Sequence, residues 1–169
     1  SWLPDYVAQQ IPQLPIVQSL GGRGVPRYLG VSASSQTVSG TSAATTVFTQ
    51  KVPAKTVAQN GRLSCRLDFT VQSPDVTNIV DISFFLGGTK IGGLIEVDTT
   101  YIDGTARPGW AEVVMVNAGA YTSQHTDTIG GFIGEDGRFN FRGNAYSTTI
   151  ATDEDQDFTA VVQWGSAGG

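Results

Sequence analysis

The sequence is poor in the residues on which most catalytic and metal sites depend. It contains one histidine and one cysteine in 169 residues, and charged residues make up 15% of it, well under the usual quarter. A single cysteine excludes an intrachain disulfide and leaves Cys65–His125 as the one thiol–imidazole pair available. Cys65 stands between Leu63 and Leu67 in an alternating pattern, where a buried and unreactive thiol is expected. The sequence therefore predicts a protein that is not an enzyme.

Positive charge and long apolar runs are also scarce. Ten Lys and Arg residues stand against fifteen Asp and Glu, and the formal net charge is −5. The basic residues form no cluster, so the electrostatic footprint of a nucleic-acid-binding protein is missing. No apolar run approaches the roughly 18 residues of a membrane span, so no membrane partner is predicted.

The chain divides into three segments of different character. Residues 1–22 contain three prolines and no Lys or Arg, and they show no strand or helix periodicity, which predicts an extended arm. Residues 23–44 form a connector rich in Gly, Ser and Thr. Residues 45–169 show one turn-punctuated strand pattern after another and are predicted to form the folded body.

The body is predicted to be all-β, with about eight antiparallel strands arranged as a sandwich or barrel. From Leu63 to Val71 every second residue is apolar, which is the pattern of a sheet with one buried face. Trp110–Asn117 is apolar on both faces, which indicates a central strand buried from two directions. The expected strands span residues 45–52, 63–71, 79–86, 90–98, 110–117, 128–133, 138–146 and 158–164. The predicted core includes Leu63, Cys65, Leu67, Phe69, Val80, Ile82 and Phe84.

Several short motifs follow one another in the body. They are Asn60–Leu63 (NGRL), Leu86–Ile91 (LGGTKI), Pro108–Glu112 (PGWAE) and the final run Asp157–Trp164 (DFTAVVQW). In this order of turns and strands, residues 45–165 resemble the jelly-roll or β-sandwich modules of tailed-bacteriophage virion proteins. Those modules include tail fibres, head fibres and capsid decoration proteins. The resemblance implies a jelly-roll-like sandwich that forms a homotrimer on a particle surface and carries no catalysis.

The resemblance leads us to expect a structural protein of a tailed-phage virion, assembled in the host cytoplasm and displayed on the particle surface. A decoration or spike protein of the capsid is favoured, because 169 residues is short for a complete tail fibre. The arm cannot bury its own apolar groups, so we expect it to attach the body to the major capsid protein or another virion protein. The residues expected to anchor it are Trp2, Tyr6, Ile11 and Leu14.

Two alternatives remain at this stage. The first is a tail-fibre or receptor-binding module at the phage tail, in which tryptophans stack on a host-surface glycan. Trp110 and Trp164 lie in or beside strand patterns, however, so a place in the core is the preferred interpretation of both. The second alternative is a small carbohydrate-active β-sandwich enzyme, for which the sequence offers no distinctive carboxylate pair.

One acidic cluster is a candidate calcium loop. Asp153, Asp155 and Asp157 stand at alternate positions, as oxygen ligands do at the start of a calcium-binding loop. Phe158 stands where an EF-hand loop needs glycine, and no Glu follows at the closing position. A solvated loop before the last strand is therefore the preferred interpretation, and no metal or cofactor is predicted.

Overall fold

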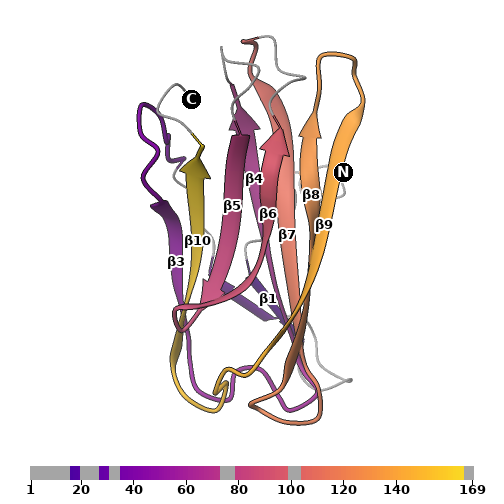
Figure 1. Cartoon of the computed structure of the whole chain (residues 1–169). Coiled ribbons are helices and arrows are strands. Elements are labelled where there is room, and N and C mark those ends of the chain that lie inside the picture. Colours follow the sequence, from indigo (N-terminus) through magenta and orange to yellow (C-terminus); the bar gives the residue numbers. More distant parts are fainter. Residues whose placement is uncertain (1–15, 20–26, 31–34, 73–78, 99–103, 166–169) are drawn as a thin grey trace, which may run out of the picture.

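The computed structural model describes residues 16–19, 27–30, 35–72, 79–98 and 104–165 (Figure 1). In these ranges the chain forms strands, turns and loops, and no helix. None of the described residues belongs to a helix long and apolar enough to cross a membrane. The predicted fold class, an all-β antiparallel sandwich of the jelly-roll-like type, is confirmed.

The strands form two antiparallel sheets packed face to face. One sheet has six strands in the order β2-β1-β4-β7-β8-β9, and the other has four in the order β3-β10-β5-β6. The chain changes sheet between β2 and β3, β3 and β4, β4 and β5, β6 and β7, and β9 and β10. The strands are β1 (Ile16–Ser19), β2 (Arg27–Gly30), β3 (Thr45–Val52), β4 (Arg62–Val71), β5 (Ile79–Leu86), β6 (Thr89–Asp98), β7 (Arg107–Asn117), β8 (Gln124–Ile133), β9 (Phe139–Thr148) and β10 (Gln156–Trp164).

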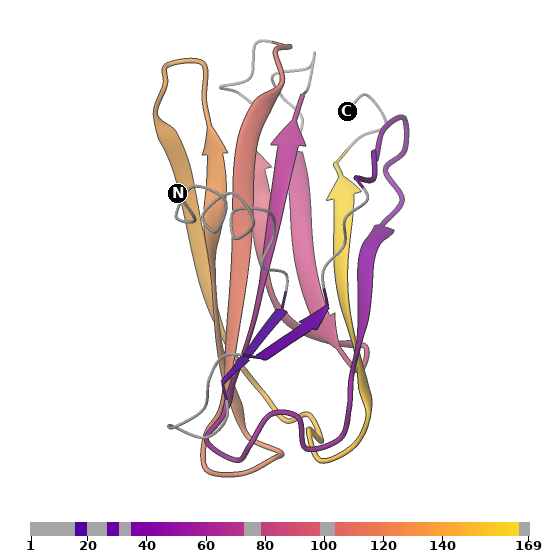
Figure 2. The same cartoon turned by 180° about the vertical axis from the view of Figure 1, so that it is seen from behind.

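The eight strands predicted in the body correspond to β3 through β10. Two further strands lie upstream of these eight and were not predicted. β1 falls within the segment predicted as an arm, and β2 falls within the predicted connector. β1 pairs with β4, where Ile16 lies opposite Cys65, and β2 pairs with β1. Figure 2 shows this short hairpin crossing the open side of the sandwich, between the edge of β4 and β3. Four-residue strands are too short to produce a readable alternation, so the sequence did not reveal them.

The inward register of β4 and β5 is the predicted one. Leu63 and Cys65 are buried, whereas Arg62 and Arg66 on the other face of β4 are exposed. Two predicted core residues of β4, Leu67 and Phe69, are half-buried and pack against the margin of the core. The largest fully buried side chains are Phe84, Phe132, Phe158, Leu63, Ile82, Leu86, Ile91, Leu94 and Met115.

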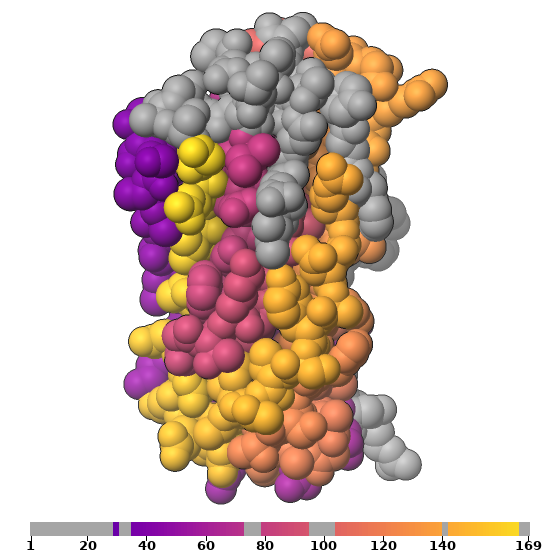
Figure 3. Space-filling model, viewed as in Figure 1, coloured from indigo at the N-terminus to yellow at the C-terminus, as the bar shows by residue number. Residues whose placement is uncertain are grey.

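The two sheets come close where β6 passes over β8 and β9. The Gly93 N–H donates a hydrogen bond to Thr128 Oγ1 (3.1 Å), and Asn144 Nδ2 donates to the Gly93 carbonyl (3.0 Å). Gly92 is required beside it, because a Cβ there would overlap Thr128 Oγ1. Figure 3 shows the surfaces of β6 and β9 adjoining on this side of the molecule. Side chains of the six-stranded sheet thus form hydrogen bonds with the backbone of β6, the edge strand of the four-stranded sheet.

A buried polar network fastens three loops together at one end of the sandwich. Asn117 Nδ2 donates to the Ala58 carbonyl and to Thr152 Oγ1, each at 2.9 Å. Gln124 Nε2 donates to Asn117 Oδ1 (3.1 Å) and to the Ile150 carbonyl (3.0 Å), while its Oε1 accepts the Ile150 N–H (2.7 Å). Asn117, Gln124 and Thr152 are all buried. Because the hydrogen bonds are reciprocal, the β3–β4, β7–β8 and β9–β10 loops hold one another in place.

Candidate interaction surface

The predicted anchor residues Trp2, Tyr6, Ile11 and Leu14 lie outside the described residues. The other sequence-derived candidates lie on the sandwich, and the structure shows what each of them contacts.

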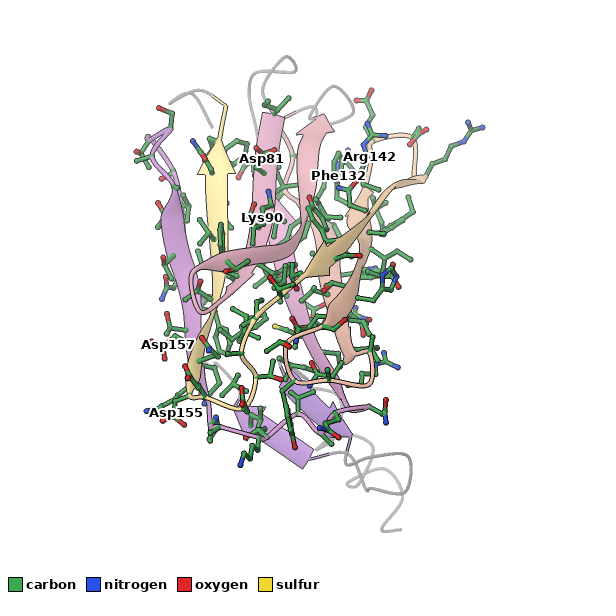
Figure 4. The ribbon with its side chains drawn as sticks, turned by 60° about the horizontal axis from the view of Figure 1, so that its bottom comes forward. Asp81, Lys90, Phe132, Arg142, Asp155 and Asp157 are labelled. Carbon is green, nitrogen blue, oxygen red and sulfur yellow. The ribbon has the colours of Figure 1, made fainter. Side chains whose placement is uncertain are left out.

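Asp155, the middle carboxylate of the acidic cluster beside β10, is bonded to other groups of the protein. Asp155 Oδ2 forms an ion pair with Lys51 Nζ (2.8 Å), and its Oδ1 accepts the Ala54 N–H (2.8 Å). The hydrogen bond from Lys51, followed by that from the Ala54 backbone, lowers the pKa of the Asp155 carboxyl. Figure 4 shows Asp155 and Asp157 at the place where the end of β3 meets the start of β10. Among the described residues, no three His, Cys, Asp or Glu side chains converge on a point that could hold a metal.

Cys65 and His125 lie on opposite faces of the six-stranded sheet and cannot form a catalytic pair. Cys65 points into the core, and burial, with a smaller contribution from the charge of Glu112, raises the pKa of its thiol to about 12. His125 is exposed on the outer face, where its Nε2 lies 3.5 Å from Asp127 Oδ1. The interpretation of Cys65 as a buried structural thiol is confirmed.

The outer face of the six-stranded sheet carries a group of large apolar side chains. Val116 is 37% exposed, Ile129 39%, Ile133 41% and Phe139 38%, and among the described residues no other large hydrophobic side chain is as exposed. Trp110 and Val114 lie half-buried on the same face, since they alternate with the buried Ala111, Val113 and Met115 of β7. We call this group the outer apolar face; it consists of Trp110, Val114, Val116, Ile129, Ile133 and Phe139.

Trp110 is at the centre of a short aromatic and cationic arrangement on this face. Its ring stacks on Phe139 of β9, with centroids 5.7 Å apart and planes inclined by 23°. The Arg66 guanidinium lies 4.9 Å from the centroid of the indole ring. Gly131 lies opposite Trp110 on the intervening strand β8. Because glycine has no side chain, the indole has room to cross β8 and reach Phe139. The preferred interpretation of Trp110 as a core residue was therefore wrong, whereas Trp164 is buried in the core.

The charged groups around the outer apolar face are mostly paired. Arg66 Nε donates a hydrogen bond to Asp68 Oδ1 (2.9 Å), and Arg66 lies opposite Glu112 in the β4–β7 register. His125 and Asp127 form a second pair on β8. An apolar and aromatic centre with an arginine and a polar margin is the usual composition of a protein–protein interface. This surface resembles an interface more than a ligand pocket.

Comparisons with protein-family models, curated proteins and solved structures found no match. No family is assigned to this chain on that basis. The surface must therefore be interpreted from its own residues.

Sequence reasoning missed the outer apolar face because β8 has an unusual alternation. Its inward positions include Thr126 and Thr128, which are buried, while Ile129 and Ile133 point outward. A hydrophobicity pattern alone assigns the isoleucines to the core. The one feature of the sequence that pointed to this face was the strand Trp110–Asn117, which is apolar on both sides and was therefore predicted to be buried from two directions.

Proposed function

We propose that this chain is a non-enzymatic structural protein that works by binding another protein surface, as a decoration or spike protein of a tailed-phage virion. The observation that carries the binding role is the outer apolar face, where Val116, Ile129, Ile133 and Phe139 lie about 40% exposed on one side of a six-stranded sheet. Surface hydrophobics scattered singly need no explanation, but several on one face, with an arginine and a stacked aromatic pair, suit a partner. The virion as the setting rests on the resemblance of residues 45–165 to phage modules.

The partner that we propose is the major capsid protein or another virion protein, reached through residues 1–22. Support comes from the place where this segment joins the sandwich. β1 pairs with β4, so the residues before it enter the molecule at the sheet that carries the outer apolar face. The arm and the face are therefore close enough to form one attachment region.

Attachment through such an arm depends on a few well-packed groups. Each large apolar side chain that becomes fully buried contributes roughly 1.5–3 kcal/mol, whereas ordering the backbone costs about 1–2 kcal/mol per residue. These totals are similar, so several arms acting together in an oligomer bind far more firmly than one. This favours a homotrimer on a particle that offers repeated sites.

The proposed function is tested on purified virions of the phage whose genome encodes this chain. Mass spectrometry should detect the chain in gradient-purified particles, and immunogold labelling should place it on the head. Labelling confined to the tail would support a tail-fibre or glycan-binding module in place of capsid decoration. Absence of the chain from purified virions would contradict the virion role altogether.

A second experiment tests attachment. Virions that lack the gene for this chain should bind added full-length protein, and they should not bind a variant that lacks residues 2–14. This deletion ends before β1, so it leaves the pairing of β1 with β4 intact. Equal binding by the deletion variant would mean that the arm is not the anchor.

A further inference from the structure

We propose that, in the free protein, residues 1–15 bind the outer apolar face of their own chain. The proposal concerns an intramolecular contact, and it stands whether or not the protein belongs to a virion. Three observations support it: where the described chain begins, how far fifteen residues reach, and what side chains each partner offers.

The chain enters the sandwich beside the outer apolar face. Ile16, the first residue of β1, lies opposite Cys65, and β1 runs antiparallel to β4. Followed backward from Ile16, the chain heads along β4 toward Arg66, the residue whose guanidinium lies over Trp110. Pro15 has no N–H to donate to β4, which favours an end to the strand pairing at this point. The segment before β1 is thus joined to the sheet one strand away from the face.

Fifteen residues are long enough to cover the face. The face spans β7, β8 and β9, and β4 alone separates it from β1 in the sheet order. Strands lie about 4.8 Å apart, so the far strand β9 is about 19 Å from β1. Fifteen residues span at most about 50 Å when extended and about 22 Å when helical. Either conformation reaches Phe139.

The side chains of the two partners are complementary. Residues 1–15 contain many large apolar groups and no Lys or Arg, and their one acidic side chain is Asp5. The face offers apolar groups of similar size, with the Arg66 guanidinium over Trp110 at its β4 margin. The apolar residues of the segment are Trp2, Leu3, Tyr6, Val7, Ile11 and Leu14. The segment therefore matches this face in hydrophobicity, while the charged groups of the face, Arg66 with Asp68 and Glu112, lie between its apolar side chains and around them.

The tether favours the segment of the same chain over any other occupant. A short flexible linker gives a segment an effective concentration in the millimolar range at its own site. A copy that is not part of the same assembly, at micromolar concentration, competes at a disadvantage of roughly a thousandfold. The arm and the face, which we propose as the attachment region, would then cover each other until the protein meets its partner.

The test compares the full chain with the variant lacking residues 2–14 by NMR. We expect chemical-shift differences to be concentrated at the Trp110 indole N–H and the Ile129, Ile133 and Phe139 side chains. Core signals such as those of Phe84 and Phe158 should not move. A synthetic peptide of residues 1–15, added to the truncated protein, should restore the full-length shifts with a dissociation constant on the order of 0.1–1 mM.

Matched substitutions separate this contact from folding. Ile133→Thr changes an exposed side chain of the face and should weaken peptide binding at least threefold. Val161→Thr, on the outer side of the four-stranded sheet, should leave peptide binding unchanged. Each variant must give the dispersed spectrum of the folded sandwich.

Three outcomes would overturn the proposal. The first is identical shifts at the face in the full-length and truncated chains. The second is a face whose signals depend on protein concentration in the full-length chain, which would mean that a second copy covers it. The third is peptide binding that the Ile133→Thr and Val161→Thr variants weaken equally. If the NMR and peptide experiments give the expected results while the chain is absent from purified virions, the contact within the chain stands and the proposed virion role is wrong.

Discussion

At the scale of single residues, two buried threonines on β8 differ in whether their hydroxyl has a partner. Thr128 Oγ1 accepts a hydrogen bond from the Gly93 N–H, whereas the buried Thr126 Oγ1 has no hydrogen-bond partner among the described residues. Both side chains are at most 2% exposed and lie on the same face of the strand. Comparing the two positions therefore measures how much a buried hydroxyl without a hydrogen-bond partner lowers the free energy of unfolding.

We predict opposite effects of the same substitution at these two positions. Thr126→Val replaces an unpaired buried hydroxyl with a methyl group and should raise the free energy of unfolding by about 1 kcal/mol. Thr128→Val leaves the Gly93 N–H without a partner and should lower it by about 1–3 kcal/mol. Urea unfolding followed by circular dichroism measures both. Equal effects of the two substitutions would contradict the hydrogen-bond assignment.

Cys65 predicts a loss of stability at alkaline pH. Its pKa is raised from about 9 to about 12 in the folded state, so between these values the unfolded chain loses a proton that the folded chain keeps. The unfolded state is then favoured, and the stability contributed by the neutral thiol falls as pH rises above about 9. At pH 10.5 the loss relative to pH 7.5 should be about 2 kcal/mol.

The Cys65→Ala variant isolates this effect. It costs stability at pH 7.5 through lost packing, but it has no thiol to ionise. The difference in unfolding free energy between the two proteins should therefore shrink by about 2 kcal/mol between pH 7.5 and 10.5. A constant difference would mean that the thiol ionises equally in both states.

The same residues show what sequence alone could predict. The alternation of β4 is strong, because its two faces carry clearly different residues, and it assigned Leu63 and Cys65 correctly to the core. In β8 the inward side carries Thr126 and Thr128 and the outward side Ile129 and Ile133, so hydrophobicity alone could not assign the faces of this strand. The threonine hydroxyl of Thr128 is tolerated inside because β6 of the other sheet supplies its donor. Such a contact between distant strands leaves no local pattern.

At the scale of elements, the passage of β6 over β8 depends on a glycine. A Cβ at Gly92 would overlap Thr128 Oγ1 and approach Val113 Cγ2 to 3.1 Å. Gly92→Ala should therefore destabilise the protein by about 1–3 kcal/mol. In the Gly92→Ala/Thr128→Ala double variant the overlapping hydroxyl is gone, so the combined loss should be smaller than the sum of the two single losses. Strict additivity, measured by chemical unfolding, would show that the two positions do not touch.

The polar network at the end of the sandwich should be among the most sensitive places in the fold. Gln124→Met preserves the size of the side chain but leaves Asn117 Oδ1 and both backbone groups of Ile150 without their partner. With each buried unpaired group costing about 1–3 kcal/mol, we expect a loss of about 3 kcal/mol or more.

Gln163→Met provides the control for this prediction. Gln163 bonds the Ser42 carbonyl at an exposed position, so its replacement should change stability by less than about 0.5 kcal/mol. Thermal unfolding of both variants provides the comparison. A small effect at Gln124 would mean that water replaces the lost hydrogen bonds.

At the scale of the whole molecule, the assembly state can be measured directly. We predict that the full chain forms a homotrimer, with a mass about three times the 17.8 kDa of one chain in multi-angle light scattering. Because the arm–face contact is proposed within one chain, Ile133→Thr should leave this mass unchanged. A monomer at micromolar concentration would contradict the trimer.

The position of β10 has a consequence for how the protein is made. β10 lies between β3 and β5, and it pairs with both, so that Val52 meets Gln156 across roughly a hundred residues of chain. During synthesis, β3 and β5 leave the ribosome long before the strand that joins them. The β5–β6 and β7–β8–β9 hairpins close from neighbouring residues, while the four-stranded sheet stays divided and its phenylalanines uncovered. Folding is therefore completed only after β10 emerges, and slow translation upstream of residue 156 prolongs the interval in which chains aggregate.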